Sequence, residues 1–191
     1  MNSRINPAAP APDASSNPYS QLVQRTIQAC RVAKEAAGEA AEGIATGTAT
    51  LLATLRKREN ELDLLDMQID DGVTTAITQV EGPQARELLA CMKIMIGVER
   101  IGDLLLSFGS SAEAAGARIE PQDRHDLTHM ASVLEKMLGD VAAAFLERDL
   151  KKAVDVLRAD AEMDRLRNLI FMRHIENPRT CPARPACRSS S

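Results

Sequence analysis

Apolar residues recur at steps of three and four along most of this chain, which is the period of an amphipathic α-helix. This period predicts five long helices, over residues 20–45, 50–78, 83–108, 121–146 and 150–175. The most apolar stretch, 88–108, still contains charged residues, which argues against a membrane span: Lys93, Glu99, Arg100 and Asp103. We therefore expect an all-α protein with no membrane insertion.

The predicted helix boundaries follow residues that start or stop helices. Ser20 is the expected N-cap of the first helix, and Gly43 and Gly47 indicate the turn after it. Further breaks are predicted at Gly82-Pro83, in a linker of glycine and serine residues over 109–121, and at Arg148-Asp149. Residues 1–17 and 178–191 are rich in Ala, Pro, Ser, Asn or Arg, and we expect both segments to be flexible.

Composition narrows the class of protein. Aromatic residues make up only 2% of the chain against 45% hydrophobic residues, so the core should be aliphatic. A net charge of −4 disfavours nucleic acid as a partner. The amino terminus lacks the apolar stretch of a secretory signal, and Cys30 and Cys91 fall within helical patterns. These features favour a cytoplasmic protein with reduced core thiols.

Two of the predicted helices carry acids next to apolar stripes. On the helix over 50–78, four acids follow one another at steps of four, three and four: Glu59, Asp63, Asp66 and Asp70. They flank an apolar stripe made of Leu55, Leu62 and Ile69. On the helix over 83–108, Glu99 and Asp103 interrupt an apolar face. Like charges at this spacing repel, so the acids either face water or bind a cation or a metal ion.

The chain contains an internal repeat. Residues 59–69 match residues 160–170 at an offset of 101, which aligns Asp160 with Glu59 and Asp164 with Asp63. The same offset applied to Glu99 points beyond residue 191. The repeat therefore predicts two related helical units, of which the second has only two helices.

The motif Val98-Glu-Arg-Ile-Gly-Asp103 resembles the signature of the PhoU family, bacterial regulators of phosphate uptake. Both copies of the repeat resemble the Asp-x-x-Val-Asn/Asp element that this family has on the second helix of each of its repeats. The resemblance spans about 20–178 and implies antiparallel helical bundles of three helices each. It assigns 18–117 to a first, complete repeat and 118–177 to a second, incomplete one.

The resemblance also implies a site and a role. Glu59, Asp63, Glu99 and Asp103 would bind a divalent or iron-type metal ion, since oxygen ligands suit Mg²⁺, Mn²⁺, Ca²⁺ or iron. Asp160 and Asp164 would supply half of a second metal site. The expected partners are the ATPase of the phosphate ABC transporter and a sensor histidine kinase. The protein would then be a regulatory adaptor, not an enzyme, that negatively regulates phosphate uptake and phosphate-starvation signalling.

Two alternatives remain open. The chain could be a metal-free helical interaction module, or a metalloenzyme with carboxylate-bridged metals. The enzyme is disfavoured because no Glu is followed three residues later by His, as in di-iron bundles. His125 and His129 lie four apart, but no acid or Cys completes a zinc set within their helix, so we expect surface residues.

The last two helices would form an incomplete bundle on their own. Their apolar residues would then line a groove: Val133, Met137, Val141, Met163, Leu166 and Ile170. We expect this groove to be covered by the first repeat or by another subunit, and the protein to be a homo-oligomer, with a dimer as the simplest case.

Overall fold

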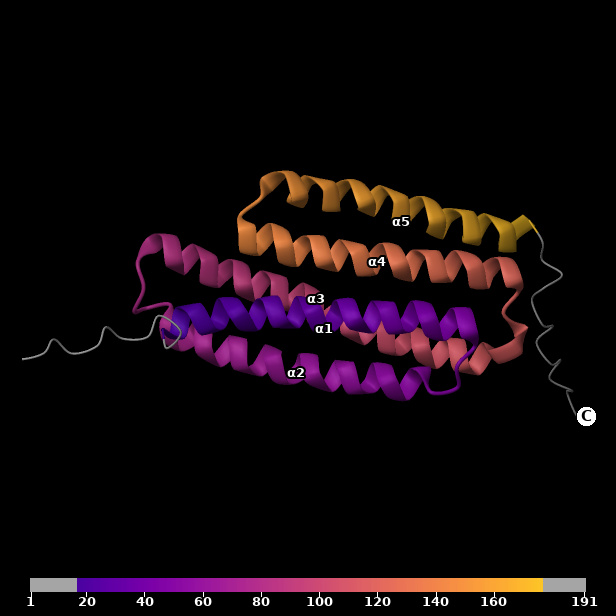
Figure 1. The fold of residues 1–191 in the computed structure, drawn as a ribbon, viewed down its shortest axis with the longest axis horizontal. Helices are drawn as coiled ribbons and strands as arrows, with labels where there is room; N and C mark the ends of the chain where they lie inside the picture. The colour runs from indigo at the N-terminus through magenta and orange to yellow at the C-terminus, as the bar shows by residue number, and fades with distance from the viewer. Residues whose placement is uncertain (1–16, 177–191) are drawn as a thin grey trace, which may run out of the picture.

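The periodic pattern folds into helices at the predicted places. The computed structural model of the chain describes residues 17–176. The two predicted flexible segments, 1–17 and 178–191, lie outside the described residues except for Asn17. The helices are α1 (Pro18–Thr46), α2 (Leu51–Ala76), α3 (Gly82–Ala115), α4 (Pro121–Glu147) and α5 (Leu150–Glu176), with a short 3-10 helix η2 (Gly116–Arg118) before α4. They lie side by side in an elongated bundle (Figure 1), which confirms the all-α fold.

Two details at the ends of α1 differ from the prediction. The N-cap is Asn17 and not Ser20: the Asn17 side chain accepts a hydrogen bond of 3.1 Å from the backbone N–H of Tyr19. Gly47 ends the helix in the left-handed conformation, at φ 69°. Gly43 lies inside the helix, where a Cβ would come within 2.7 Å of the Leu51 side chain. Gly43 therefore serves the close approach of α2 and does not form the turn.

The third helix continues seven residues past its predicted end at 108. Gly109, taken from the sequence as the start of a linker, is buried inside α3. A Cβ there would lie 2.7 Å from Leu55 Cδ1 on α2. The packing of α3 on α2 thus overrides the low helix propensity of glycine and serine at 109–111.

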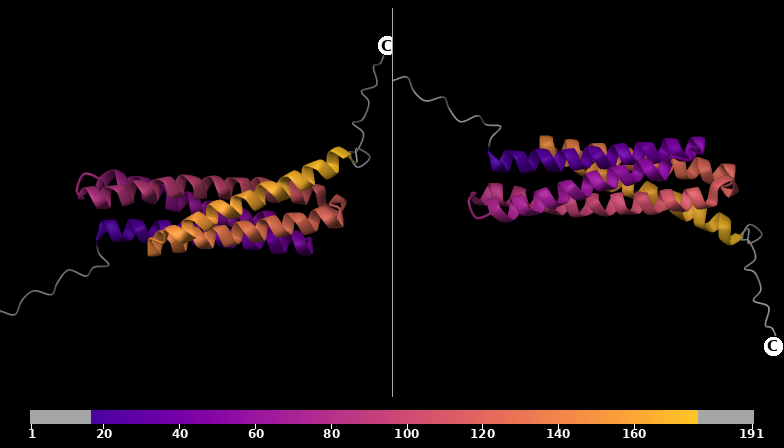
Figure 2. Two further views of the ribbon diagram at one scale, coloured as in Figure 1. Left: turned by 90° about the horizontal axis from the view of Figure 1, so that it is seen from above. Right: turned by 90° about the horizontal axis from the view of Figure 1, so that it is seen from below.

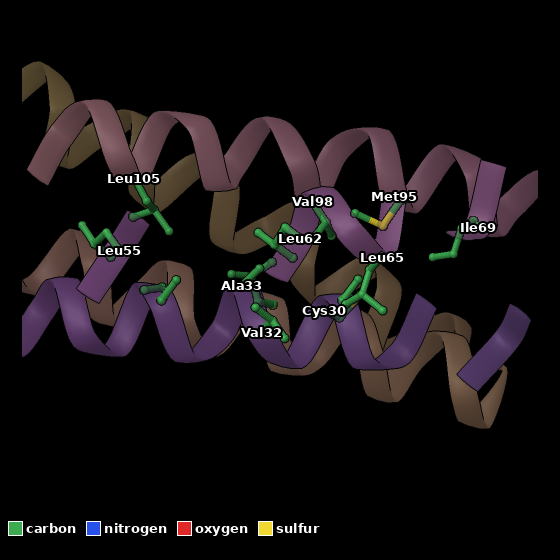
Figure 3. Close-up of a cluster of buried hydrophobic side chains, with 14 of the residues drawn as sticks. Cys30, Val32, Ala33, Leu55, Leu62, Leu65, Ile69, Met95, Val98 and Leu105 are labelled. Carbon is green, nitrogen blue, oxygen red and sulfur yellow. The ribbon is translucent and has the colours of Figure 1, made fainter. Parts of the chain in front are cut away.

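The main core lies among α1, α2 and α3 (Figure 3). The predicted stripe of α2 is fully buried: Leu55, Leu62 and Ile69 are at most 2% exposed. It faces an alanine-rich side of α1, whose small side chains permit close helix packing. Cys30 and Cys91 are buried, free thiols, and burial raises the pKa of Cys30 to about 11, so it is an unreactive core residue.

The first helix of the second repeat, α4, packs antiparallel along α1. Arg124 Nη1 donates a hydrogen bond of 2.6 Å to the carbonyl oxygen of Ile44, so the start of α4 meets the end of α1. Farther along, Gly38 faces the side chain of Glu135. The helix α4 therefore docks on α1, as expected if the predicted first repeat covers part of the predicted second repeat. The six residues of the predicted groove are buried or half-buried.

The last helix, α5, has the fewest neighbours. Among residues 17–176 it packs only on α4 and lies on the outside of the bundle (Figures 1 and 2). An ion pair and a hydrogen bond attach its far end to the start of α4: Arg173 Nη1 lies 2.6 Å from Asp123 Oδ1, and His174 Nε2 lies 2.9 Å from Asp123 Oδ2. Asp126, also bound by Arg173, has a lowered pKa because of that hydrogen bond.

Candidate metal-binding site

The predicted acids of α2 and α3 share one face of the bundle. In the core beneath them, Leu105 lies near Leu55 and Val98 near Leu62 (Figure 3). Because the two helices run in opposite directions, this register brings Glu59 level with Asp103 and Asp63 level with Glu99. The four acids Glu59, Asp63, Glu99 and Asp103 are called the carboxylate face below.

A close contact between the helices lies next to the carboxylate face. Gly102 is buried, and a Cβ there would come within 2.6 Å of Leu62 Cδ1. Leu62 is itself 1% exposed and precedes Asp63 in sequence, as Gly102 precedes Asp103. The missing side chain therefore lets α3 approach α2 where the acids meet. Sequence reasoning missed this role, although a glycine between two acids in a helix interior was a usable signal.

The acids influence one another electrostatically across the two helices. The pKa of Glu59 is raised, first because the carboxylate is partly desolvated and then because Asp63 and Asp103 are close. The positive charge of Arg56 opposes this shift. An acid of α3 thus acts on an acid of α2, as the predicted site requires.

Glu99 shows the same coupling from the other helix. Its pKa is raised by partial desolvation and then by Asp103, Asp66 and Asp63, and Arg100 acts in the opposite direction. Asp66 therefore belongs to the same negative region, and its own pKa is also raised by desolvation and by neighbouring acids. Sequence analysis placed Asp66 in the acidic row of α2 but not in the metal set.

These raised pKa values make the carboxylate face a source of instability near neutral pH. The folded protein binds protons at Glu59, Asp66 and Glu99 more tightly than the unfolded chain does. Their contribution to stability is therefore present below the unfolded pKa, near 4, and is lost as the pH rises through the folded pKa. A bound cation would remove this penalty.

Other acids nearby form ion pairs with one shared arginine. Arg58 lies between α1 and α2, with Nη1 2.8 Å from Glu35 and Nη2 2.7 Å from Glu39, and it also pairs with Glu61 at 3.3 Å. Within residues 17–176, by contrast, no ion pair is formed by any member of the carboxylate face. The four acids of this face are thus not in contact with a cationic side chain, although Arg56 and Arg100 act on Glu59 and Glu99 from a longer distance.

The donor set suits a hard cation, but its side chains are not gathered around one point. Across the described part of the chain, no three His, Cys, Asp or Glu side chains come close enough together to hold a metal ion. Asp63 and Asp103 are exposed, and Glu59 and Glu99 are half-buried. Carboxylates at such positions change rotamer readily, so an ion would be bound by turning them toward one another.

The remaining candidates lie elsewhere. Asp160 and Asp164 are exposed on α5, on the other side of the bundle from α2, and Asp164 pairs with Arg167 at 3.1 Å. His125 and His129 are exposed, and His129 Nε2 lies 3.4 Å from Glu162 Oε1. The structure therefore brings together the four acids of α2 and α3, and not the pair on α5.

None of the five described helices is long and apolar enough to cross a lipid bilayer.

By its geometry the described part of the chain is a helical bundle with a carboxylate face whose four acids form no ion pairs. Comparison with models of protein families shows which family this bundle belongs to. The model of the PhoU domain matches residues 26–111 and 127–184, which together cover more than half of the chain. The chain therefore belongs to the PhoU family.

Individual relatives agree with this assignment at modest identity. An uncharacterized protein of Deinococcus radiodurans is 30% identical over 131 residues, covering 64% of this chain and 47% of the relative. The phosphate-specific transport system accessory protein PhoU homolog of Clostridium acetobutylicum is 25% identical over 122 residues, 60% of this chain and 54% of its own length. The protein of the same name from Caulobacter vibrioides is 27% identical over 117 residues, 59% of this chain and 50% of its own. The chain spans about half the length of the curated relatives it matches.

Proposed function

We propose that the protein is a regulatory adaptor that restrains phosphate uptake and phosphate-starvation signalling in the cytoplasm. The observation that carries this proposal is the PhoU match over both halves of the chain, with relatives named as accessory proteins of phosphate-specific transport. Its partners would be the ATPase of the phosphate ABC transporter and the associated sensor histidine kinase. Contact with these proteins, not catalysis, would carry the signal.

The proposal includes a metal ion on the carboxylate face. Glu59, Asp63, Glu99 and Asp103 would supply oxygen ligands to a divalent or iron-type ion. The ion would supply positive charge that offsets the repulsion seen in the raised pKa values of Glu59 and Glu99. These residues would then hold α2 and α3 in one relative position and fix the shape of the docking face.

A metal-free helical interaction module is the second candidate. It is favoured by the absence, among residues 17–176, of a ready-made group of three ligands. A carboxylate-bridged metalloenzyme has less support, because no Glu in the sequence is followed three residues later by His, as in di-iron bundles.

We expect Asp103→Asn to weaken binding of Mn²⁺ or Mg²⁺ at least tenfold, because one of four carboxylate ligands loses its charge. For the unaltered protein, metal at one hundred times its Kd should add about 2.7 kcal/mol of stability, which corresponds to roughly 5–10 °C in Tm. The measurements are elemental analysis of untagged protein and thermal unfolding with and without chelator.

The matched control is Asp71→Asn. Asp71 is an exposed acid on α2, about a quarter turn or more away from the acidic row, so its loss should leave metal binding unchanged. An unaltered metal content in Asp103→Asn would remove the site assignment and favour the metal-free module.

The adaptor proposal is tested by capture of the two expected partners. Full-length protein should retain the transporter ATPase and the sensor kinase from its own cell, and loss of the gene should raise phosphate uptake. Turnover of a phosphoester by the purified protein, with neither partner bound, would contradict the adaptor and support an enzyme. Asp103→Asn separates the adaptor proposal from the metal-site proposal, because partner binding can persist in a protein that has lost its metal.

A further inference from the structure

A histidine of α4 and an acid of α5 face each other on the surface where these two helices pack. His129 Nε2 lies 3.4 Å from Glu162 Oε1, and the two side chains are 48% and 41% exposed. The helices lie side by side (Figure 1), and Glu162 comes from the middle of α5. The contact therefore joins α5 to α4 far from the turn that connects them.

The distance between the two atoms matches that of two ligands on one zinc ion. An N–H···O hydrogen bond usually spans about 2.7–3.2 Å, so 3.4 Å is long for one. In a tetrahedral zinc site the nitrogen and oxygen ligands lie about 2.0–2.2 Å from the metal, which places two of them roughly 3.4 Å apart. His129 and Glu162 thus already have the separation of two zinc ligands.

A third ligand is provided by His125, four residues before His129 on the same helix. Side chains at this spacing are neighbours on a helix surface, with about 5–6 Å between their Cβ atoms. Two histidines at positions i and i+4 are a recurrent zinc-binding pair. In the structure the third side chain is not yet close enough to the other two. Because His125 is exposed, a change of its rotamer brings the ring to the same point.

The charged groups around these residues leave them available. Asp126, which lies between the two histidines in sequence, is bound by Arg173 and Gln122 and is not a free ligand. Arg165 competes for Glu162, with its Nη2 3.7 Å from Glu162 Oε1. The Arg165 side chain is 70% exposed, and an exposed ion pair of this kind contributes little. A metal ion can therefore displace it.

We propose that His125, His129 and Glu162 bind one Zn²⁺ ion that links α5 to α4, with water as the fourth ligand. Two imidazoles and a carboxylate are a set that zinc takes in proteins, whereas Mg²⁺ and Ca²⁺ prefer oxygen ligands. The site is thus chemically distinct from the carboxylate face on α2 and α3. The sequence offered only the two histidines, because the acid that completes the set lies on the next helix.

The zinc ion strengthens a weak junction of the bundle. Among the described helices α5 packs only on α4, and Leu166 is its one buried residue. Its far end is attached through Arg173 and Asp123. A metal ion with ligands on both helices adds a second attachment, in the middle of α5. Because the complete ligand set exists only when α5 is docked, the free energy of zinc binding stabilises the docked state.

The first test is calorimetric titration of the full chain with Zn²⁺, with Cys181→Ser and Cys187→Ser in place so that those thiols bind no zinc. We expect one ion at this site, bound about tenfold or more weakly after His125→Gln, His129→Gln or Glu162→Gln, since even an outer-shell partner contributes this much. Asp103→Asn is the control and should leave this binding unchanged. Undiminished affinity in Glu162→Gln overturns the proposal, because zinc would then be held by α4 alone.

The second test asks whether the ion joins the two helices. With Zn²⁺ at one hundred times its Kd, amides of α5 that exchange by local opening of the helix should exchange about one hundredfold more slowly. The amides of α2 should be unaffected, and Glu162→Gln should abolish the slowing in α5. Co²⁺ in place of zinc should show the visible absorption of a tetrahedral site. Zinc that binds without slowing exchange in α5 overturns the link between the helices.

Discussion

Gly102→Ala is expected to lower the free energy of unfolding by about 1–3 kcal/mol, the usual cost of overfilling a packed core. The new methyl group would meet Leu62 Cδ1 at 2.6 Å, and Leu62 is enclosed, so α2 and α3 must move apart. The same movement should weaken metal binding at the carboxylate face, where Asp63 and Asp103 follow the two residues in contact. Chemical denaturation and metal titration of the variant measure the two effects.

The chain provides a matched control five residues earlier. Gly97 also lies within α3, but no atom would lie within 4 Å of a Cβ there. Gly97→Ala should therefore stabilise the protein by about 0.5–1 kcal/mol, the ordinary gain in helix propensity. Equal effects of the two substitutions would show that α3 does not approach α2 closely at Gly102.

A double-mutant cycle isolates the contact. Leu62→Ala alone should cost about 2–5 kcal/mol, because it leaves a cavity in the core. Combined with Gly102→Ala it should cost less than the sum of the two single changes, because the new methyl group fills part of that cavity. Additive costs would place the strain somewhere other than the contact between these two residues.

Backbone hydrogen exchange in α5 is expected to be faster than in α2. In the single chain α5 packs only on α4 and buries one residue, Leu166, so it should open locally at a lower free energy than α2.

The internal reference for this measurement is α2. Its apolar stripe is enclosed by α1 and α3, so the backbone amides of α2 should be strongly protected. Protection in α5 that equals that of α2 in dilute protein would contradict the weak packing described for the single chain.

Much of the local structure could be predicted from the sequence. The 3.6-residue period of apolar positions placed all five helices, and the stripe of Leu55, Leu62 and Ile69 is buried as expected. Proline in the first turn of α3 and the turn at Arg148 were also recognised, because these residues act through the backbone of their own segment. The acids of α2 and α3 could be found for the same reason, since their spacing along one helix is a local property.

Contacts between helices could not be obtained in this way. Glycine has a low helix propensity, so the sequence placed Gly109 in a linker. Gly109 still lies inside α3, because α2 packs against it. The register that places Glu59 beside Asp103 depends on how Leu62 and Gly102 interlock, which no single helix specifies. The docking of α4 on α1, which leaves α5 packed on α4 alone among the described helices, depends on small residues that meet only after both helices have formed. The sequence thus determined the helices and which side of each is apolar, through interactions between residues a few positions apart. Only the tertiary structure decided which of those sides are covered, because that choice rests on the shapes of surfaces far apart in the chain.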